Sequence, residues 1–174
     1  MAVFDATVLL CFLEPDAAAP TDPATNRPIS NAKARIDHLI ATLESRRETI
    51  VIPAPALSEV LVHAGEAGPQ YLNILNNSRC FRVEAFDERA AIELAAMTRE
   101  AIETGDLRAG LDITRAKLKF DRQIVATARI HSETAIYSDD QDIASLGRTF
   151  DMEVVPIRDL PLPPEDPQKE FDFD

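Results

Sequence analysis

Aromatic residues are scarce in this sequence: they make up 6% of the chain, and tryptophan is absent. This argues against a surface that binds nucleic acid by stacking successive bases on aromatic rings. Basic residues are also in the minority, since 18 lysines and arginines face 30 aspartates and glutamates, for a net charge of −12. This balance argues against a large basic face for nucleic acid, although a small basic patch is compatible with it.

Cysteine is nearly absent as well. The two cysteines, Cys11 and Cys80, lie far apart in apolar surroundings, "LLCFL" and "RCFRV". Two distant cysteines are too few for a disulfide framework or for a cysteine-based zinc site. We expect two buried free thiols, because unpaired cysteine behaves as a small apolar residue.

Long hydrophobic runs are missing too. The longest, "TVLLCFL", is far shorter than the roughly 20 residues that a membrane-spanning helix needs. The opening "MAVFDATVLL" has no basic residue and is interrupted by an acid, so it does not resemble a secretory signal peptide. We therefore expect a soluble, cytoplasmic protein with no membrane partner.

The sequence does contain enough apolar residues to build one core. They make up 45% of 174 residues, a length typical of a single domain. Short apolar stretches, "VF", "IVI", "FRV", "AIY" and "VV", alternate with segments that carry apolar residues at helical spacing. This alternation predicts a three-layer α/β/α fold around a mainly parallel sheet of four to five strands, with helices on both faces.

We expect one folded domain over residues 1–157 and an acidic, proline-rich tail over residues 158–174. Within the domain, residues 14–30 carry four prolines and no apolar periodicity, which predicts a long loop. Loops of this length inside a compact domain are uncommon and often functional. Residues 159–174 hold six acids and one lysine, and we expect them to lie on the surface or to be disordered.

Several acidic residues follow the predicted strands or begin the helices beside them. In an open α/β sheet, ligands bind where the carboxyl ends of the strands share an edge, so these carboxylates are expected to converge there. Converging carboxylates repel one another unless a cation joins them, and oxygen-only ligands suit Mg²⁺ or Mn²⁺. The residues are Asp5, Glu59, Asp121, Asp139, Asp140 and Asp142.

Simpler interpretations exist for most of these acids. Asp121 can cap the helix that follows it. Asp140 and Asp142 can be acids in the first turn of a helix, where the helix dipole favours them. Glu59 can lie on the exposed face of an otherwise apolar helix. Asp5 is the hardest to explain without a ligand, because it interrupts an apolar run and burying an unpaired charge is expensive.

Four segments carry the candidate acids, in the order "VFDATVLL", "IPAPALSEVL", "KFDRQIVATARIH" and "AIYSDDQDI". In this order they resemble the sequence blocks of PIN domains, a family whose bacterial members include the VapC-like ribonuclease toxins. "VFDATVLL" resembles the opening strand with its first acid, and "IPAPALSEVL" resembles the second block, whose glutamate follows a small or hydroxyl residue. "KFDRQIVATARIH" is similar to the third block, an aspartate before an alanine-rich helix. "AIYSDDQDI" is similar to the fourth, a strand, a hydroxyl, one variable residue and Asp-x-Asp. The resemblance covers residues 1 to about 157.

The resemblance implies a metal-dependent endonuclease that most often acts on RNA, and we expect single-stranded RNA. The catalytic and metal-binding residues that it selects are Asp5, Glu59, Asp121 and Asp140, for one or two Mg²⁺ or Mn²⁺ ions. Asp142 would be an outer ligand or a ligand of a second ion. Thr7 and Ser138 would hydrogen-bond a ligand or a phosphate. Asp139, at the variable position, is expected to be solvated and to have no chemical role.

The resemblance also implies protein partners. Toxins of this family are held inactive by a cognate antitoxin, and many form dimers. We therefore expect a small antitoxin protein and a homodimer.

The segment from residue 108 to residue 131 holds six basic residues against two acids. Some of these can meet phosphates beside the site, and the expected substrate-binding residues are Arg115, Lys117, Lys119 and Arg122. A solvated surface of mixed charge is an equally good interpretation.

Two other functions remain open at this point. "FDATV" and "SDDQD" superficially resemble the haloacid-dehalogenase-like phosphatases, whose aspartyl nucleophile is followed two residues later by a second acid. Thr7 stands at that position here, which ranks an aspartyl-nucleophile phosphatase or phosphotransferase low. The third hypothesis is a non-catalytic interaction module, which would be indicated by a missing ligand, yet all four acid positions are filled.

Overall fold

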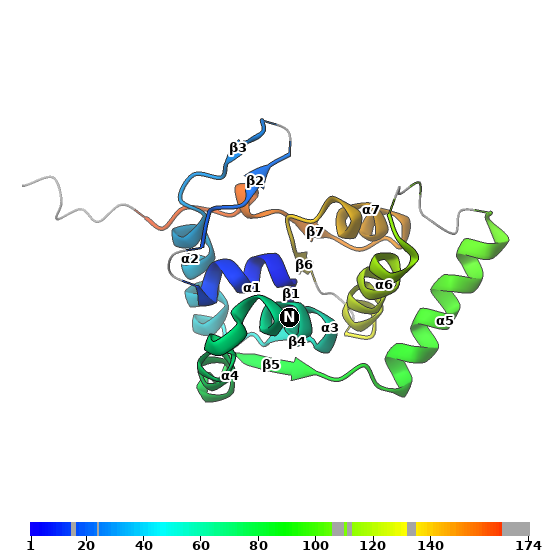
Figure 1. Cartoon of the computed structure of the whole chain (residues 1–174), viewed down its shortest axis with the longest axis horizontal. Helices are drawn as coiled ribbons and strands as arrows, with labels where there is room; N and C mark the ends of the chain where they lie inside the picture. The colour runs from blue at the N-terminus through cyan, green and yellow to red at the C-terminus, as the bar shows by residue number, and fades with distance from the viewer. Residues whose placement is uncertain (15–16, 24, 106–109, 111–112, 132–134, 165–174) are drawn as a thin grey trace, which may run out of the picture.

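A sheet of five parallel strands lies at the centre of the molecule (Figure 1). The computed structural model describes residues 1–14, 17–23, 25–105, 110, 113–131 and 135–164. The strands are β1 (Ala2–Phe4), β4 (Ile50–Pro53), β5 (Phe81–Glu84), β6 (Ala135–Tyr137) and β7 (Val154–Val155). Their order is β5, β4, β1, β6, β7, so the first strand of the chain is the central one. The predicted sheet is confirmed.

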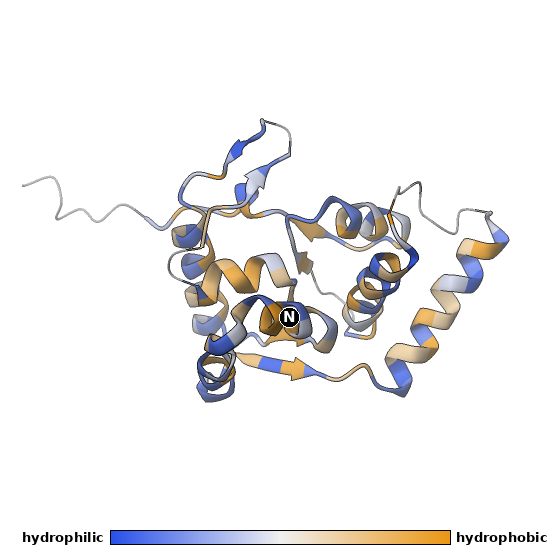
Figure 2. Ribbon diagram, in the orientation of Figure 1, coloured by the Kyte–Doolittle hydropathy of each residue, from blue (hydrophilic) through white to orange (hydrophobic). Residues whose placement is uncertain are grey.

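The register of the sheet aligns the ends of its central strands. Val3 of β1 lies opposite Val51 of β4 and opposite Ile136 of β6. All three side chains are fully buried, and Figure 2 shows apolar residues along these strands. Because the strands are parallel, the residues that follow β1, β4 and β6 emerge at one edge of the sheet.

Helices cover both faces of the sheet. The connections from β1 through β4 to β5 contain α1 (Ala6–Leu13), α2 (Ala32–Ser45), α3 (Ala54–Ala64) and α4 (Gly68–Asn77). The return path to β6 and β7 contains α5 (Glu88–Glu103), α6 (Arg115–Arg129) and α7 (Gln141–Thr149). Right-handed crossovers that run in opposite directions place their helices on opposite faces. In Figure 1, α1, α2 and α4 lie left of the sheet and α5 to α7 lie right of it, which confirms the three-layer arrangement.

Helix α6 differs from the sequence prediction. It runs unbroken from Arg115 to Arg129, so Asp121 lies inside it. Thr114 is the residue that caps it, since its hydroxyl accepts a hydrogen bond of 3.2 Å from the backbone N–H of Lys117. The interpretation of Asp121 as a helix cap is therefore wrong. Because residues four apart share a face of a helix, Lys117 and Asp121 lie side by side.

Residues 14–30 are not entirely a loop. They contain a two-stranded antiparallel hairpin, β2 (Thr21–Asp22) and β3 (Arg27–Pro28), which projects from the top of the molecule in Figure 1. An ion pair of 2.8 Å between Arg158 and Asp22 ties the hairpin to the segment that follows β7. Residues 15, 16 and 24 lie outside the described residues.

The packed part of the chain extends beyond the expected boundary at residue 157. A 3-10 turn spans Ile157–Asp159, and Leu160 is buried. The guanidinium of Arg35 on α2 donates a hydrogen bond to the carbonyl of Leu160. The start of the expected tail is therefore attached to α2, while residues 165–174 lie outside the described residues.

Both cysteines are buried and free, as expected. Within the described part of the chain, every helix lacks either the length or the apolar character that crossing a bilayer requires.

Candidate functional site

Acidic side chains from four separate elements meet at the carboxyl edge of the central strands. Asp5 directly follows β1, and Asp140 and Asp142 lie at the start of α7, just after β6. Asp121 comes from α6, and Glu59 from α3, the helix that follows β4. The fold therefore brings these five residues from across the chain to one region.

Asp5 is a buried carboxylate held by two hydroxyl groups. Only 3% of the residue is exposed. Its Oδ2 accepts a hydrogen bond of 2.8 Å from Ser138 Oγ and one of 3.3 Å from Thr7 Oγ1. Burial raises the pKa of Asp5, and the hydrogen bonds from Ser138 and Thr7 only partly oppose this effect. The carboxylate is thus fixed in place, but its negative charge is poorly compensated.

Ser138 links Asp5 to the start of α7. While its Oγ donates to Asp5, it accepts a hydrogen bond of 3.0 Å from the backbone N–H of Asp140. Asp140 in turn caps α7, because its Oδ1 accepts a hydrogen bond of 2.7 Å from the backbone N–H of Asp142. The helix-terminus interpretation of Asp140 is therefore correct as far as it goes. This role uses Oδ1 of Asp140, and Oδ2 is left to contact a neighbouring lysine, Lys117.

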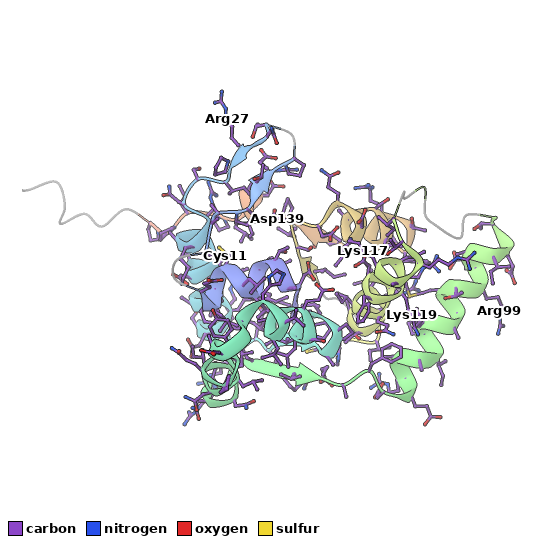
Figure 3. All side chains as sticks on the ribbon, viewed as in Figure 1. Cys11, Arg27, Arg99, Lys117, Lys119 and Asp139 are labelled. Carbon is purple, nitrogen blue, oxygen red and sulfur yellow. The ribbon has the colours of Figure 1, made fainter. Side chains whose placement is uncertain are left out.

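A lysine ammonium lies among these carboxylates. Nζ of Lys117 is 2.9 Å from Oδ2 of Asp140 and 3.1 Å from Oδ2 of Asp121, and it also contacts Oδ2 of Asp142. Figure 3 shows Lys117 on α6, the helix that packs beside α7. Partial burial lowers the pKa of Lys117, but the three carboxylates outweigh burial and raise the pKa well above its usual value. The amine is therefore protonated at neutral pH.

Even with this ammonium, the site carries excess negative charge. Burial raises the pKa of Asp121 from 3.8 to about 6, the contact with Lys117 lowers it, and the charges of Asp140 and Asp142 raise it again. One positive charge thus faces three carboxylates. The negative charge that Lys117 does not compensate favours the binding of a proton or of a further cation by these carboxylates.

Glu59 lies at the rim of the site. The residue is exposed, yet the protein around its carboxylate removes enough water to raise its pKa, and the charge of Asp5 raises it further. Lys117 opposes both effects through its charge. The expected exposed position of Glu59 and its expected proximity to the other acids are therefore compatible.

The donor atoms fit a hard divalent cation. Every candidate ligand is a carboxylate oxygen, which is the type that Mg²⁺ and Mn²⁺ prefer. Among the described residues, no three Asp, Glu, His or Cys side chains are arranged around a common point as they are at a bound metal. The ammonium of Lys117 lies between the carboxylates instead, and it marks the position where they attract positive charge.

The structure places the four residues expected to bind substrate in different environments. Arg115 and Lys119 are exposed on α6. Arg122 is only 6% exposed, and this burial argues against its expected contact with RNA phosphates. Lys117 contacts the carboxylates, as described above, and was not foreseen in that role. The sequence did contain a signal for it, since Lys117 lies four residues before Asp121, but only a continuous helix gives that spacing a meaning.

Asp139 is not the solvated residue that its sequence position suggested. It is partly buried, and its Oδ1 accepts a hydrogen bond of 3.1 Å from the backbone N–H of Ile157. Burial raises the pKa of Asp139, and this hydrogen bond opposes the shift. Figure 3 shows Asp139 between the hairpin and α7. Its contact fastens the segment after β7 to the end of β6.

A cleft opens beside Asp140 and Asp142. Its volume is about 620 Å³, and two arginines, Arg148 of α7 and Arg158, lie in its wall together with Pro23 of the hairpin. Sequence reasoning missed both arginines, because their approach to the acids depends on how α7, β7 and the hairpin pack. The wall of the cleft therefore contains both acidic and cationic groups.

Comparisons with known proteins place this geometry in context. The family model described as the PIN domain matches residues 29–148, a segment that includes Glu59, Asp121, Asp140 and Asp142. No curated protein matches the sequence.

Solved structures that are similar in fold include two VapBC complexes. One is VapBC2 from Rickettsia felis bound to a DNA fragment from its promoter, with a TM-score of 0.55 and 11% sequence identity. The alignment covers 89% of this chain and 97% of that chain. DNA-bound VapBC from Salmonella typhimurium has a TM-score of 0.55 and 15% identity, over 90% and 97%. At such low identities, this likeness is evidence about the fold alone.

Proposed function

Because this chain belongs to the PIN-domain family, we propose that it is a Mg²⁺- or Mn²⁺-dependent endoribonuclease that hydrolyses phosphodiester bonds of single-stranded RNA. The observation that carries the proposal is the meeting of carboxylates from α6 and the start of α7 around one cation, the Lys117 ammonium. The buried carboxylate of Asp5 is linked to this group through Ser138. A purely structural role does not require so many acids at one place, since like charges close together cost stability.

Asp5, Asp121 and Asp140 are the proposed principal metal ligands, with Glu59 at the rim and Asp142 as an outer or second-ion ligand. When bound, such an ion supplies a Lewis acid that activates water and offsets the negative charge of the phosphate. The protein contributes orientation. Ser138 and Thr7 hold the carboxylate of Asp5 through their hydrogen bonds, as outer partners of metal ligands commonly do.

Arg148 and Arg158 are proposed to meet the RNA backbone. Both line the cleft next to Asp140 and Asp142, and guanidinium groups match phosphate geometry. Arg115 and Lys119 remain proposed phosphate contacts at the periphery, because they are exposed on the helix that carries Asp121. A few well-placed cations suffice for binding even though the chain as a whole is acidic.

A role as the toxin of a toxin–antitoxin pair, and a homodimer, complete the proposal. The two similar structures are VapBC assemblies. Val62 of α3 and Ile92 of α5 are exposed apolar side chains, at 79% and 64%, and we take Ile92 as the candidate contact with a second copy of the chain. Light scattering on the purified chain and on the Ile92→Glu variant tests the homodimer. A dimer that persists in Ile92→Glu argues against a role of Ile92 in self-association.

Neither alternative function has specific support. A phosphatase of the aspartyl-nucleophile type would have an acid where Thr7 stands, and here the Thr7 hydroxyl donates a hydrogen bond to Asp5. A non-catalytic module has no need for the buried carboxylates of Asp5 and Asp121, each 3% exposed.

The proposal is tested with end-labelled single-stranded RNA and the purified chain. We expect cleavage with Mg²⁺ or Mn²⁺, none with EDTA, and a loss of at least about 100-fold in Asp5→Asn and Asp140→Asn. Asp37→Asn on α2 is the matched control, because Asp37 only pairs with Lys33 at the surface. Circular dichroism verifies that each variant is folded. Cleavage that persists in EDTA or in folded Asp5→Asn refutes the proposal.

A further inference from the structure

The contacts of Lys117 are unlike those of an ordinary surface ion pair. A single ammonium has three donors, and here Nζ faces three carboxylates, those of Asp121, Asp140 and Asp142. Asp121 lies on the same helix, whereas the other two belong to the start of α7. The lysine therefore joins two helices through the acids proposed to hold the metal.

The surroundings show why a cation is needed at this position. Only 5% of the Asp121 side chain is exposed, and the side chains of Asp140 and Asp142 are 26% and 20% exposed. Without a cation, three carboxylates would lie close together with little water to screen them. In the absence of a divalent ion, Lys117 supplies the compensating charge.

The same contacts prevent the lysine and a metal from sharing the site. Oδ2 of Asp121 and Oδ2 of Asp140 are both within 3.1 Å of Nζ, so an ion bound to these atoms would lie against the ammonium and be repelled by it. Lys117 can leave, however. Its side chain is 41% exposed, and its long flexible stem allows the charged end to move into water.

We propose that Lys117 is a built-in counter-ion of the carboxylate site, which neutralises the acids when no divalent ion is bound and which a divalent ion must displace. The inference rests on the proposed metal-dependent function and adds a consequence to it. The metal affinity of the protein then depends on the difference between two free energies, that of the metal ion and that of the Lys117 ammonium bound to the same carboxylate oxygens. Lys117 weakens metal binding and stabilises the metal-free fold.

The first test measures Mn²⁺ binding by isothermal titration calorimetry in the wild type and in Lys117→Met, which keeps an unbranched apolar stem and removes the charge. We expect Lys117→Met to bind Mn²⁺ about tenfold more tightly or better, which corresponds to about 1.4 kcal/mol, because the displaced ammonium contacts three partly or fully buried carboxylates. In EDTA we expect a lower melting temperature for this variant, and a larger rise on adding Mn²⁺ than in the wild type.

Lys119→Met is the matched control for these measurements. It removes the same charge from the same helix, but Lys119 is exposed and lies about 200° around the helix from Lys117. We expect its Mn²⁺ affinity to stay at the wild-type value. An equal gain in both variants would mean that net charge alone acts, and this result overturns the proposal. Weaker or unchanged binding in Lys117→Met also overturns it.

A second test uses the wild-type chain and does not depend on the stability of any variant. The probe is acetylation by an N-hydroxysuccinimide ester, followed by peptide mass spectrometry, with and without Mg²⁺. Displacement by the metal frees the amine, so labelling of Lys117 is expected to rise with Mg²⁺ while labelling of Lys119 stays constant. Labelling of Lys117 that does not change at saturating Mg²⁺ contradicts displacement.

Failure of this inference can be told apart from failure of the proposed function. If the wild type and Lys117→Met bind Mn²⁺ equally and both cleave RNA, the counter-ion role is refuted and the nuclease stands. If neither binds Mn²⁺ at millimolar concentration, the metal site itself is refuted, and the inference falls with it.

Discussion

The hydroxyl of Ser138 donates a hydrogen bond of 2.8 Å to the carboxylate of Asp5, although the two residues are 133 positions apart in the chain. Both are almost fully buried, at 2% and 3% exposure. The pairing of β1 with β6 brings them together, since Phe4 lies opposite Tyr137 and each polar residue directly follows its strand. The two central strands therefore determine the position of the most deeply buried acid of the site.

Ser138→Ala tests this contact. The change removes the hydrogen bond to Asp5 and the one accepted from the backbone of Asp140. We expect a loss of about 1 to 3 kcal/mol in the free energy of unfolding and weaker Mn²⁺ binding, measured by urea denaturation and calorimetry. Ser45→Ala is the control, because Ser45 Oγ makes only an exposed bond at the end of α2. Equal losses in both variants would contradict the special role of Ser138.

Asp121→Asn is expected to stabilise the metal-free protein near neutral pH. The pKa of Asp121 is raised from 3.8 to about 6, with burial as the largest cause. The folded state therefore binds the proton more tightly than the unfolded state, and stability is lost as the pH rises from about 4 to about 6. An asparagine avoids this loss, and we expect a gain on the order of 1 to 3 kcal/mol.

Calorimetric melting in EDTA at acidic and neutral pH measures this effect. The difference in stability between wild type and Asp121→Asn should grow with pH through this window and then level off. A variant that is less stable than the wild type at neutral pH would mean that the ion pair with Lys117 outweighs the burial of Asp121.

Arg148→Ala tests the proposed RNA contact at the cleft. In the background of Asp5→Asn, which is expected to prevent cleavage, we expect the Kd for single-stranded RNA to rise about 3- to 10-fold and the salt dependence of binding to fall by roughly one phosphate contact. Fluorescence anisotropy at several salt concentrations measures both. Arg99→Ala is the control, because Arg99 is exposed on α5, away from the cleft (Figure 3). The contact is disproved if both variants lose affinity equally.

Gly147→Ala tests the packing of α7 on β7. A Cβ at this position would clash with Cγ2 of Val154 and would lie 3.2 Å from the carbonyl oxygen of Met152. We expect a destabilisation of about 1 to 3 kcal/mol, because an overpacked contact forces the neighbouring elements apart. Gly68→Ala is the control, since its added Cβ would meet only Cδ2 of Leu61 at 3.4 Å. Urea denaturation compares the two, and a stable Gly147→Ala would show that β7 yields easily.

Local patterns in the sequence were sufficient for the strands and for the acids that follow them. Apolar runs such as "IVI" and "AIY" predict buried strands because a parallel sheet covers both of their faces. The position of Asp5 and Asp140 after such runs then indicates one shared edge. Helix α6 was harder, since its first turns are rich in basic residues and only Thr114 marks its start.

The sequence by itself therefore determined the α/β architecture, the family and the acids that follow the strands, because each of these depends on short-range periodicity and spacing. Only the tertiary structure decided that Lys117 lies among the carboxylates, that Arg122 is buried, and that Asp139 fastens the chain after β7. These outcomes depend on which elements pack against one another. The packing of the whole core decides this, and the spacing of residues in one short segment does not predict it.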